Sequence, residues 1–200
     1  FYVHMGRMYI YRSQAHDIAM STALLKNARV VDGTGAPWFR GAVRLEDGEI
    51  ADVSRVPEPS TDADTVLDVD GDVVSPGFID THSHSDLQLF ADPTLAPKVR
   101  QGITTEILGQ DGFSMAPMYR EGGAEEWQDQ LAGLAGRISR EWTWGGVGSY
   151  LDAVEESGVA PNVGTLVGHG TVRFNVLGME DAEPTDEALS EMQDLVAEAM

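Results

Sequence analysis

The chain has 200 residues, of which 42% are hydrophobic, so it can bury a sizeable core and is not disordered throughout. Its 33 acidic and 13 basic side chains give a formal net charge of −20, which opposes nonspecific binding to nucleic acid or anionic lipid. Cysteine is absent, which excludes disulfides, thiolate zinc sites and cysteine nucleophiles, and no apolar run approaches the ~18 residues of a transmembrane helix. We therefore expect a globular protein without nucleic-acid or membrane partners.

Lysine is scarce among the basic residues and occurs only at Lys26 and Lys98. High acidity with little lysine resembles the proteins of salt-loving organisms, because screening within roughly 3 Å at 1 M salt makes self-repulsion tolerable. The alternative is an ordinary acidic surface on a mesophilic protein. A halophilic origin is therefore an expectation that rests on this resemblance.

Residues 1–21 open the chain with a polar stretch that has no clear periodicity, and they lack the long apolar segment of a signal peptide. We expect these residues to lie outside the fold, as unstructured or non-native sequence. The missing signal peptide and the missing cysteines favour a cytoplasmic location.

Residues 22–75 are predicted to form a small β domain. Short apolar or alternating runs predict strands at 23–25, 28–31, 41–45, 50–53, 66–69 and 72–74. The Asp47-Gly48 pair between two of these runs is a strong hairpin-turn signal. Together these features favour a β-sandwich-like module.

From residue 76 onward the pattern changes to strands that alternate with helices. The predicted strands are 78–82, 102–108 and 162–167, and the predicted helices are 92–101, 127–140, 147–156 and 187–200. Thr185 is the expected N-cap of the last helix, and the chain ends inside this helix, so we expect a longer protein. The alternation predicts a parallel α/β sheet over 76–200.

His82 and His84 follow an apolar run that is typical of a buried strand. Alternate residues of a strand face the same way, so these imidazoles are expected to lie close enough to bind one divalent metal ion, and histidine suits Zn²⁺. Parallel α/β barrels carry their active sites at this carboxyl end of their strands. A lone pair of this spacing is common by chance, but the strand before it and Asp86 after it favour a metal site over two surface histidines.

Residues 22–200 resemble the N-terminal part of the amidohydrolase superfamily, and specifically the D-aminoacylase (N-acyl-D-amino-acid deacylase) family. The matching stretches are 27–35, 76–86, 102–117, 142–150 and 160–173. The stretch 76–84, which reads Pro-Gly-Phe-Ile-Asp-Thr-His-Ser-His, marks the superfamily. Residues 102–105 running into 112–117, together with 167–173, mark the deacylase branch. The resemblance implies an incomplete metal-dependent (β/α)₈ TIM barrel, preceded by the small β domain.

The resemblance also implies that His82 and His84 are metal ligands after the first barrel strand. The next ligand in the family, usually a cysteine after the second strand, falls on Asp111 here. A carboxylate can bind zinc and also suits harder ions, so Asp111 is expected to replace the sulfur. The alternative is that Asp111 only shapes the turn before Gly112.

Three further residues are candidates for roles around the metal site or the substrate. Asp86 is expected to orient a histidine ligand or to cap a loop. His169, at the end of the third predicted strand, is a substrate or outer-sphere contact, or it is structural. Arg173 is suited to grip a substrate carboxylate, or to cap helix and loop carbonyl groups.

The function implied by the resemblance is hydrolysis of N-acyl-D-amino acids to a carboxylate and a D-amino acid, by water activated on one or two divalent ions such as Zn²⁺. The family's catalytic aspartate and two more histidine ligands are expected beyond residue 200, so residues 1–200 contain no catalytic residue and should be inactive alone. Lysine is absent after Lys98, which disfavours the carboxylated-lysine bridge of hydantoinases and dihydroorotases. The alternatives are another amidohydrolase, hydantoinase-like or a deaminase, and a degenerate scaffold without activity.

Overall fold

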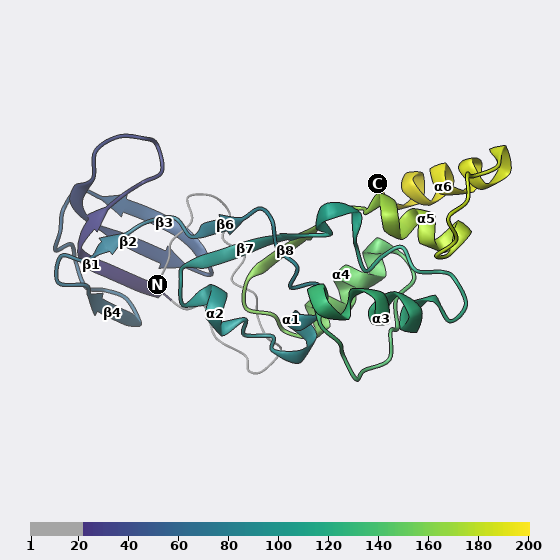
Figure 1. Ribbon diagram of the computed structural model, residues 1–200. Helices are drawn as coiled ribbons and strands as arrows, with labels where there is room; N and C mark the ends of the chain where they lie inside the picture. Colours follow the sequence, from purple (N-terminus) through teal and green to yellow (C-terminus); the bar gives the residue numbers. More distant parts are fainter. Residues whose placement is uncertain (1–21) are drawn as a thin grey trace. The chain divides into compact units, whose positions relative to one another are not determined.

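The computed structural model describes residues 22–200, so the expectation for residues 1–21 lies outside the described part (Figure 1). The chain divides into two compact units between Phe78 and Ile79. Within the described residues, no helix has the length and apolar character needed to cross a membrane.

The described part of the first unit is one mixed β-sheet with the strand order β3-β2-β1-β4, in which β5 also pairs with β1. Its strands are β1 (Thr22–Val30), β2 (Phe39–Glu46), β3 (Glu49–Ser54), β4 (Thr65–Asp68) and β5 (Val73–Val74). The strands β1, β2 and β3 are antiparallel neighbours, whereas β4 and β5 run parallel to β1. The expected small β domain is therefore present, and its described strands form a single sheet.

The strand β1 joins two segments that the sequence predicted as separate strands. A register shift lies between Leu25 and Ala28, where Asn27 adopts a left-handed conformation with φ of 59°. Asparagine tolerates this conformation, and the Asn27 amide hydrogen-bonds to the Pro57 carbonyl at 2.8 Å. The bulge bends the strand without ending it, which hydrophobic patterning does not reveal.

The second unit contains a three-stranded sheet in the order β6-β7-β8, with helices between successive strands (Figure 1). The strands are β6 (Phe78–Asp80), β7 (Ile103–Leu108) and β8 (Asn162–Thr165), and β7 runs parallel to β8. The helices are α1 (Gln88–Ala91), α2 (Ala96–Val99), α3 (Gly123–Ala135), α4 (Val147–Glu156), α5 (His169–Leu177) and α6 (Asp186–Ala199). The predicted alternation of strands and helices is confirmed.

Several element boundaries differ from the sequence prediction. Of the helix expected at 92–101, the structure has only the short helix α2, and α1 ends before that range begins. Pro93 and a left-handed Leu95 (φ 41°) lie between α1 and α2. The helix α3 begins earlier than expected and ends before Gly136, which has a φ of 80°. The helix α5 was missed, since its short run of β-branched residues and glycine resembles a continued strand rather than a helix.

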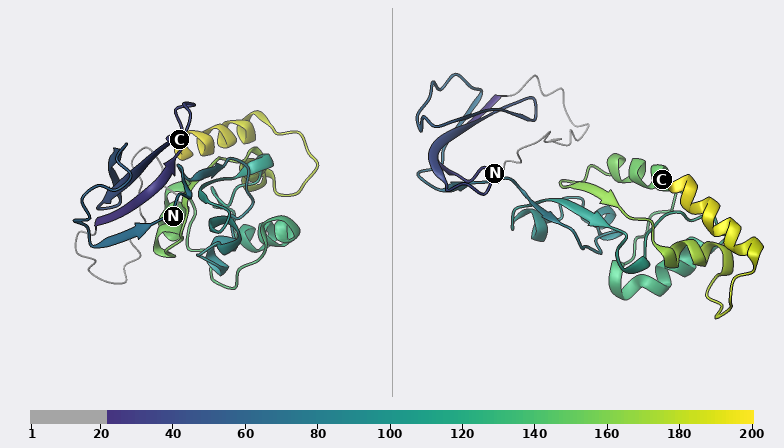
Figure 2. Two further views of the ribbon diagram at one scale, coloured as in Figure 1. Left: turned by 90° about the vertical axis from the view of Figure 1, so that its left-hand side faces the viewer. Right: turned by 90° about the horizontal axis from the view of Figure 1, so that it is seen from above.

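The two C-terminal helices, α5 and α6, lie side by side in the second unit (Figure 2). The Thr185 hydroxyl accepts a hydrogen bond from the Ala188 amide at 3.2 Å, so the predicted N-cap of α6 is confirmed. Leu189 and Val196 of α6 remain exposed.

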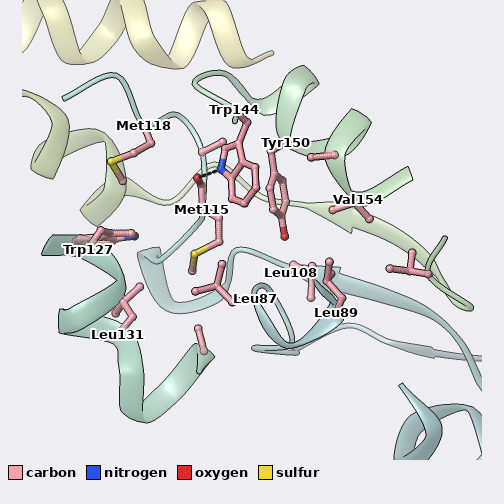
Figure 3. Close-up of a cluster of buried hydrophobic side chains, with 14 of the residues drawn as sticks. Leu87, Leu89, Leu108, Met115, Met118, Trp127, Leu131, Trp144, Tyr150 and Val154 are labelled. Atoms are coloured by element: carbon pink, nitrogen blue, oxygen red, sulfur yellow. Dashed lines mark hydrogen bonds between the residues drawn. The ribbon is translucent and has the colours of Figure 1, made fainter. Parts of the chain in front are cut away.

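The core of the second unit is formed by side chains from β7, α3, α4 and the segments that connect them (Figure 3). Leu108 of β7, Trp127 and Leu131 of α3, and Tyr150 and Val154 of α4 all belong to this cluster. Burial of each of these large apolar side chains stabilises the folded state by roughly 1.5–3 kcal/mol relative to leaving it exposed.

Two polar side chains of this core fix loop segments next to the sheet. The Trp144 indole donates a hydrogen bond to the Met115 carbonyl at 2.9 Å (Figure 3). The buried Tyr150 hydroxyl donates to the Asp86 carbonyl at 3.0 Å. Because Asp86 lies two residues after His84, the core directly restrains the backbone of the histidine segment.

Candidate metal centre

His82 and His84 lie in the loop that follows β6, not on the strand itself. The strand ends at Asp80, and the Asp80 side chain accepts a hydrogen bond from the His82 amide at 3.2 Å. The two imidazole rings are 5.4 Å apart between centroids and meet edge to face at 76°. The His82 side chain is 58% exposed and that of His84 is 19% exposed, so both can reach a ligand from solvent.

Asp111 lies in the turn that follows β7, within the short helix η1 (Gln110–Gly112). Its Oδ2 atom lies 3.2 Å from His82 Nε2 and 3.1 Å from His84 Nε2. The three donor atoms all lie within 4.8 Å of one another. Asp111 has a φ of 56°, a left-handed conformation that aspartate tolerates better than most residues. The sequence-predicted trio is therefore brought together at the ends of β6 and β7.

The donor set has the residue types of a zinc site. Hydrogen bonds with His82, and secondarily with His84, lower the pKa of Asp111, so its carboxylate is ionised at neutral pH. Ligands at about 2.0–2.1 Å from a tetrahedral Zn²⁺ lie about 3.3–3.4 Å from each other, close to the separations between Asp111 and each histidine. Two imidazole nitrogens and one carboxylate oxygen are common zinc donors, so these residues fit the metal.

Asp86 is fully buried and contacts the turn between β7 and Asp111. Its Oδ1 atom accepts a hydrogen bond from the Gly109 amide at 3.0 Å, and its Oδ2 atom has no hydrogen-bond partner among the described residues. Burial raises the pKa of Asp86 to about 6. The observed contact of Asp86 therefore holds the backbone two residues before Asp111.

His169 and Arg173 belong to α5, which the sequence had not predicted. His169 is the first residue of this helix and is exposed, and it follows β8 at the same edge of the sheet as Asp111 follows β7. The Arg173 guanidinium donates hydrogen bonds to the carbonyl groups of Glu180 and Ala182, at 2.6 and 2.9 Å. The observed contacts of Arg173 are thus with the loop before α6.

Sequence reasoning missed a polar cluster beneath the histidines, composed of Asp80, Ser83, Lys98 and Glu106. A signal was present, because Glu106 is a charged residue in the middle of an otherwise apolar and β-branched strand. Such a residue is rarely buried without a partner. Glu106 is completely buried, and Lys98 is its partner.

Comparison with known families identifies the fold around these residues. The Amidohydrolase family matches residues 65–200, which is more than half of the chain. The chain belongs to the amidohydrolase family. Its α/β fold is that of the first part of an amidohydrolase barrel, with a small β domain before it.

The amidohydrolase chain is also similar to individual deacylases. It is 33% identical over 177 residues to the D-aminoacylase of Alcaligenes xylosoxydans xylosoxydans, covering 88% of this chain and 35% of that protein. It is 33% identical over 189 residues to the N-acyl-D-aspartate deacylase of the same organism, covering 91% of this chain and 35% of that protein. The chain thus spans about a third of the length of these relatives, and the predicted resemblance to the D-aminoacylase family is confirmed.

Among solved structures, this amidohydrolase is similar to the N-acyl-D-glutamate deacylase from Bordetella bronchiseptica, complexed with zinc and a phosphonate inhibitor. The TM-score is 0.75 at 30% identity, and the match covers 90% of this chain and 36% of that protein.

Proposed function

We propose that the protein to which this chain belongs is a metal-dependent hydrolase that cleaves the amide bond of N-acyl-D-amino acids. The products are a carboxylate and a D-amino acid. The observation that carries the proposal is the convergence of His82, His84 and Asp111 at the ends of two adjacent strands. The similarity to proteins named D-aminoacylase and N-acyl-D-aspartate deacylase supports the substrate class.

We propose Zn²⁺ as the metal, as one ion or as part of a two-metal site. A bound divalent ion supplies Lewis-acid polarisation of the substrate carbonyl and a water molecule with a pKa of about 7. His82 and His84 present Nε2 toward Asp111. If Nε2 binds the metal, it carries no proton, so the proton of each neutral ring must be on Nδ1. The zinc in the similar N-acyl-D-glutamate deacylase structure supports the choice of metal.

We propose Asp111 as the third ligand, in place of the cysteine sulfur that is usual in the D-aminoacylase family. Its Oδ2 atom faces both imidazoles, and its lowered pKa keeps it negatively charged. A carboxylate retains the charge that a thiolate would supply, but as a harder donor. The group that accepts the proton of the attacking water is proposed to lie outside these 200 residues.

The proposal is tested in the full-length protein with His84→Ala and Asp111→Ala variants. We expect wild-type protein to retain bound zinc after dialysis and to hydrolyse N-acetyl-D-amino acids but not their L-enantiomers. Both variants should lose at least tenfold in zinc affinity and in activity, because each removes one of three donors. Metal content by atomic emission and release of free amino acid provide the two measurements.

Asp129→Ala is the matched control, since Asp129 on α3 is 53% exposed, close to the 55% of Asp111, but pairs with Arg137 far from the histidines in sequence. It should leave metal content and activity unchanged. Unchanged metal content and activity in Asp111→Ala would remove Asp111 from the site. Zinc binding without hydrolysis of N-acyl-D-amino acids would favour a hydantoinase-like enzyme, a deaminase or an inactive scaffold.

A further inference from the structure

The polar cluster of Asp80, Ser83, Lys98 and Glu106 includes and contacts the segment that carries His82 and His84. Lys98 Nζ on α2 lies 2.5 Å from Asp80 Oδ2, 3.1 Å from Ser83 Oγ and 3.2 Å from Glu106 Oε1. The Ser83 hydroxyl donates to Glu106 Oε2 at 3.0 Å. One lysine therefore joins the end of β6, the histidine loop and the middle of β7.

This cluster is more than a surface ion pair. The Glu106 carboxyl is completely buried, and Ser83 is buried as well. Burial by itself lowers the pKa of Lys98, but the hydrogen bond to Asp80 and the ion pair with Glu106 outweigh it, so the pKa is raised and the ammonium stays charged. Removing Lys98 would leave the buried Glu106 carboxylate without its ion-pair partner, which is costly, so this pairing is strongly favoured.

The cluster restrains the histidine segment at consecutive positions. Asp80 receives Lys98 on Oδ2 and the His82 amide on Oδ1. Ser83, which separates the two histidines in sequence, is held by its side chain to Lys98 and Glu106 and by its amide to the Ile107 carbonyl at 3.3 Å. The His82 side chain is mostly exposed and is contacted by His84 and Asp111, so the anchorage of its backbone contributes to its direction.

The same cluster is tied to the strand that leads to Asp111. Glu106 lies on β7 with Leu108, and the chain continues through Gly109 to Asp111. A shift of Ser83 relative to Glu106 would therefore change the separation between the histidine nitrogens and the Asp111 carboxylate.

We propose that Lys98 and Glu106 are positioning residues that lock the His82-Ser83-His84 segment against β7 and so set the spacing of the three metal donors. The inference rests on the proposed metal site. Neither residue belongs to the proposed donor set. Both contact Ser83, and Lys98 also contacts Asp80.

The test is Co²⁺ titration of the full-length protein, with Lys98→Met and Glu106→Gln variants. Visible absorption of bound Co²⁺ reports both the affinity and the ligand geometry. We expect each variant to weaken Co²⁺ binding by roughly tenfold and to shift the absorption bands, as changes behind metal ligands commonly do. Thermal unfolding in the presence of a chelator measures stability separately.

Lys26→Met is the matched control, because Lys26 is the other lysine of the chain and forms an ion pair with Asp68 at 2.9 Å in the first unit. It should leave the Co²⁺ affinity and spectrum unchanged. If Lys98→Met does not fold, Glu106→Gln decides the question, since it preserves the shape of the side chain. Wild-type affinity and spectrum in a folded network variant, whatever its stability, would overturn the inference.

The two proposals fail in different ways. Absence of Co²⁺ binding in the wild-type protein, or unchanged binding in His84→Ala, would overturn the proposed metal site. Normal binding that is lost in His84→Ala but retained in Lys98→Met and Glu106→Gln would overturn only the positioning role.

Discussion

Asp111 is the residue at which this chain departs from the deacylase pattern that it resembles. Its left-handed backbone and the glycine that follows it turn the carboxylate toward both histidines, at 3.2 and 3.1 Å. A ligand at this position needs only a short side chain with a negative donor, which aspartate and cysteine both provide. We therefore propose that the exchange preserves a metal site while changing the hardness of one donor.

This difference predicts a change in metal preference for Asp111→Cys. The thiolate is a softer donor, so we expect the ratio of zinc to manganese affinity to rise at least tenfold over that of the wild type. Competition between the two metals against a chromophoric chelator, in the full-length protein, measures this ratio. An unchanged ratio would mean that Asp111 does not contact the ion.

At the scale of elements, the end of β7 is held in place by close backbone packing. A β-carbon on Gly109, whose φ is 72°, would lie 2.3 Å from the Leu166 carbonyl oxygen that follows β8. The same glycine donates its amide to the buried Asp86. The turn that carries Asp111 is thus held by a hydrogen bond to Asp86 and by close packing against the segment after β8.

Gly109→Ala is therefore expected to destabilise the protein by about 2–4 kcal/mol and to weaken zinc binding, because the turn must move away from β8. Denaturant unfolding and zinc titration provide the measurements. Gly133→Ala on α3 is the control, since a β-carbon there meets no atom within 4 Å and alanine favours a helix by about 0.5–1 kcal/mol. Equal stabilities for the two variants would contradict the role given to Gly109.

At the scale of the whole molecule, the net charge of −20 acts on stability through self-repulsion. The few ion pairs among the described residues, such as Lys26 with Asp68 and Arg137 with Asp129, neutralise only a small part of the acidic excess. Repulsion between the remaining carboxylates is screened over about 10 Å at 0.1 M salt and about 3 Å at 1 M salt.

We accordingly expect the thermal midpoint of the protein to rise when NaCl is increased from about 0.1 M to about 1 M. Calorimetry at constant pH and in excess chelator separates this effect from metal binding. The same rise with KCl would assign it to screening. A midpoint that stays constant or falls would contradict both the repulsion argument and the expected halophilic character.

Local signals in the sequence were sufficient for the strand and helix alternation after residue 76 and for the histidine pair. Turn residues and hydrophobic period are short-range properties, so β7, α4 and the Thr185 cap were predicted close to their observed bounds. The resemblance of the stretch around Asp111 also indicated which carboxylate would join the histidines. The helix α5 was not predicted, because its few residues carry no clear helical period and its formation depends on packing.

By itself, the sequence determined the chemical groups available to this amidohydrolase chain: two closely spaced imidazoles, an aspartate after the next strand, and no cysteine. The tertiary structure decided that these donors converge within 4.8 Å, and that Lys98 and Glu106 meet beneath them. The physical reason is that both arrangements join residues on different elements. Their separation is set by strand pairing, helix packing and a buried charge network, none of which has a local pattern along the chain.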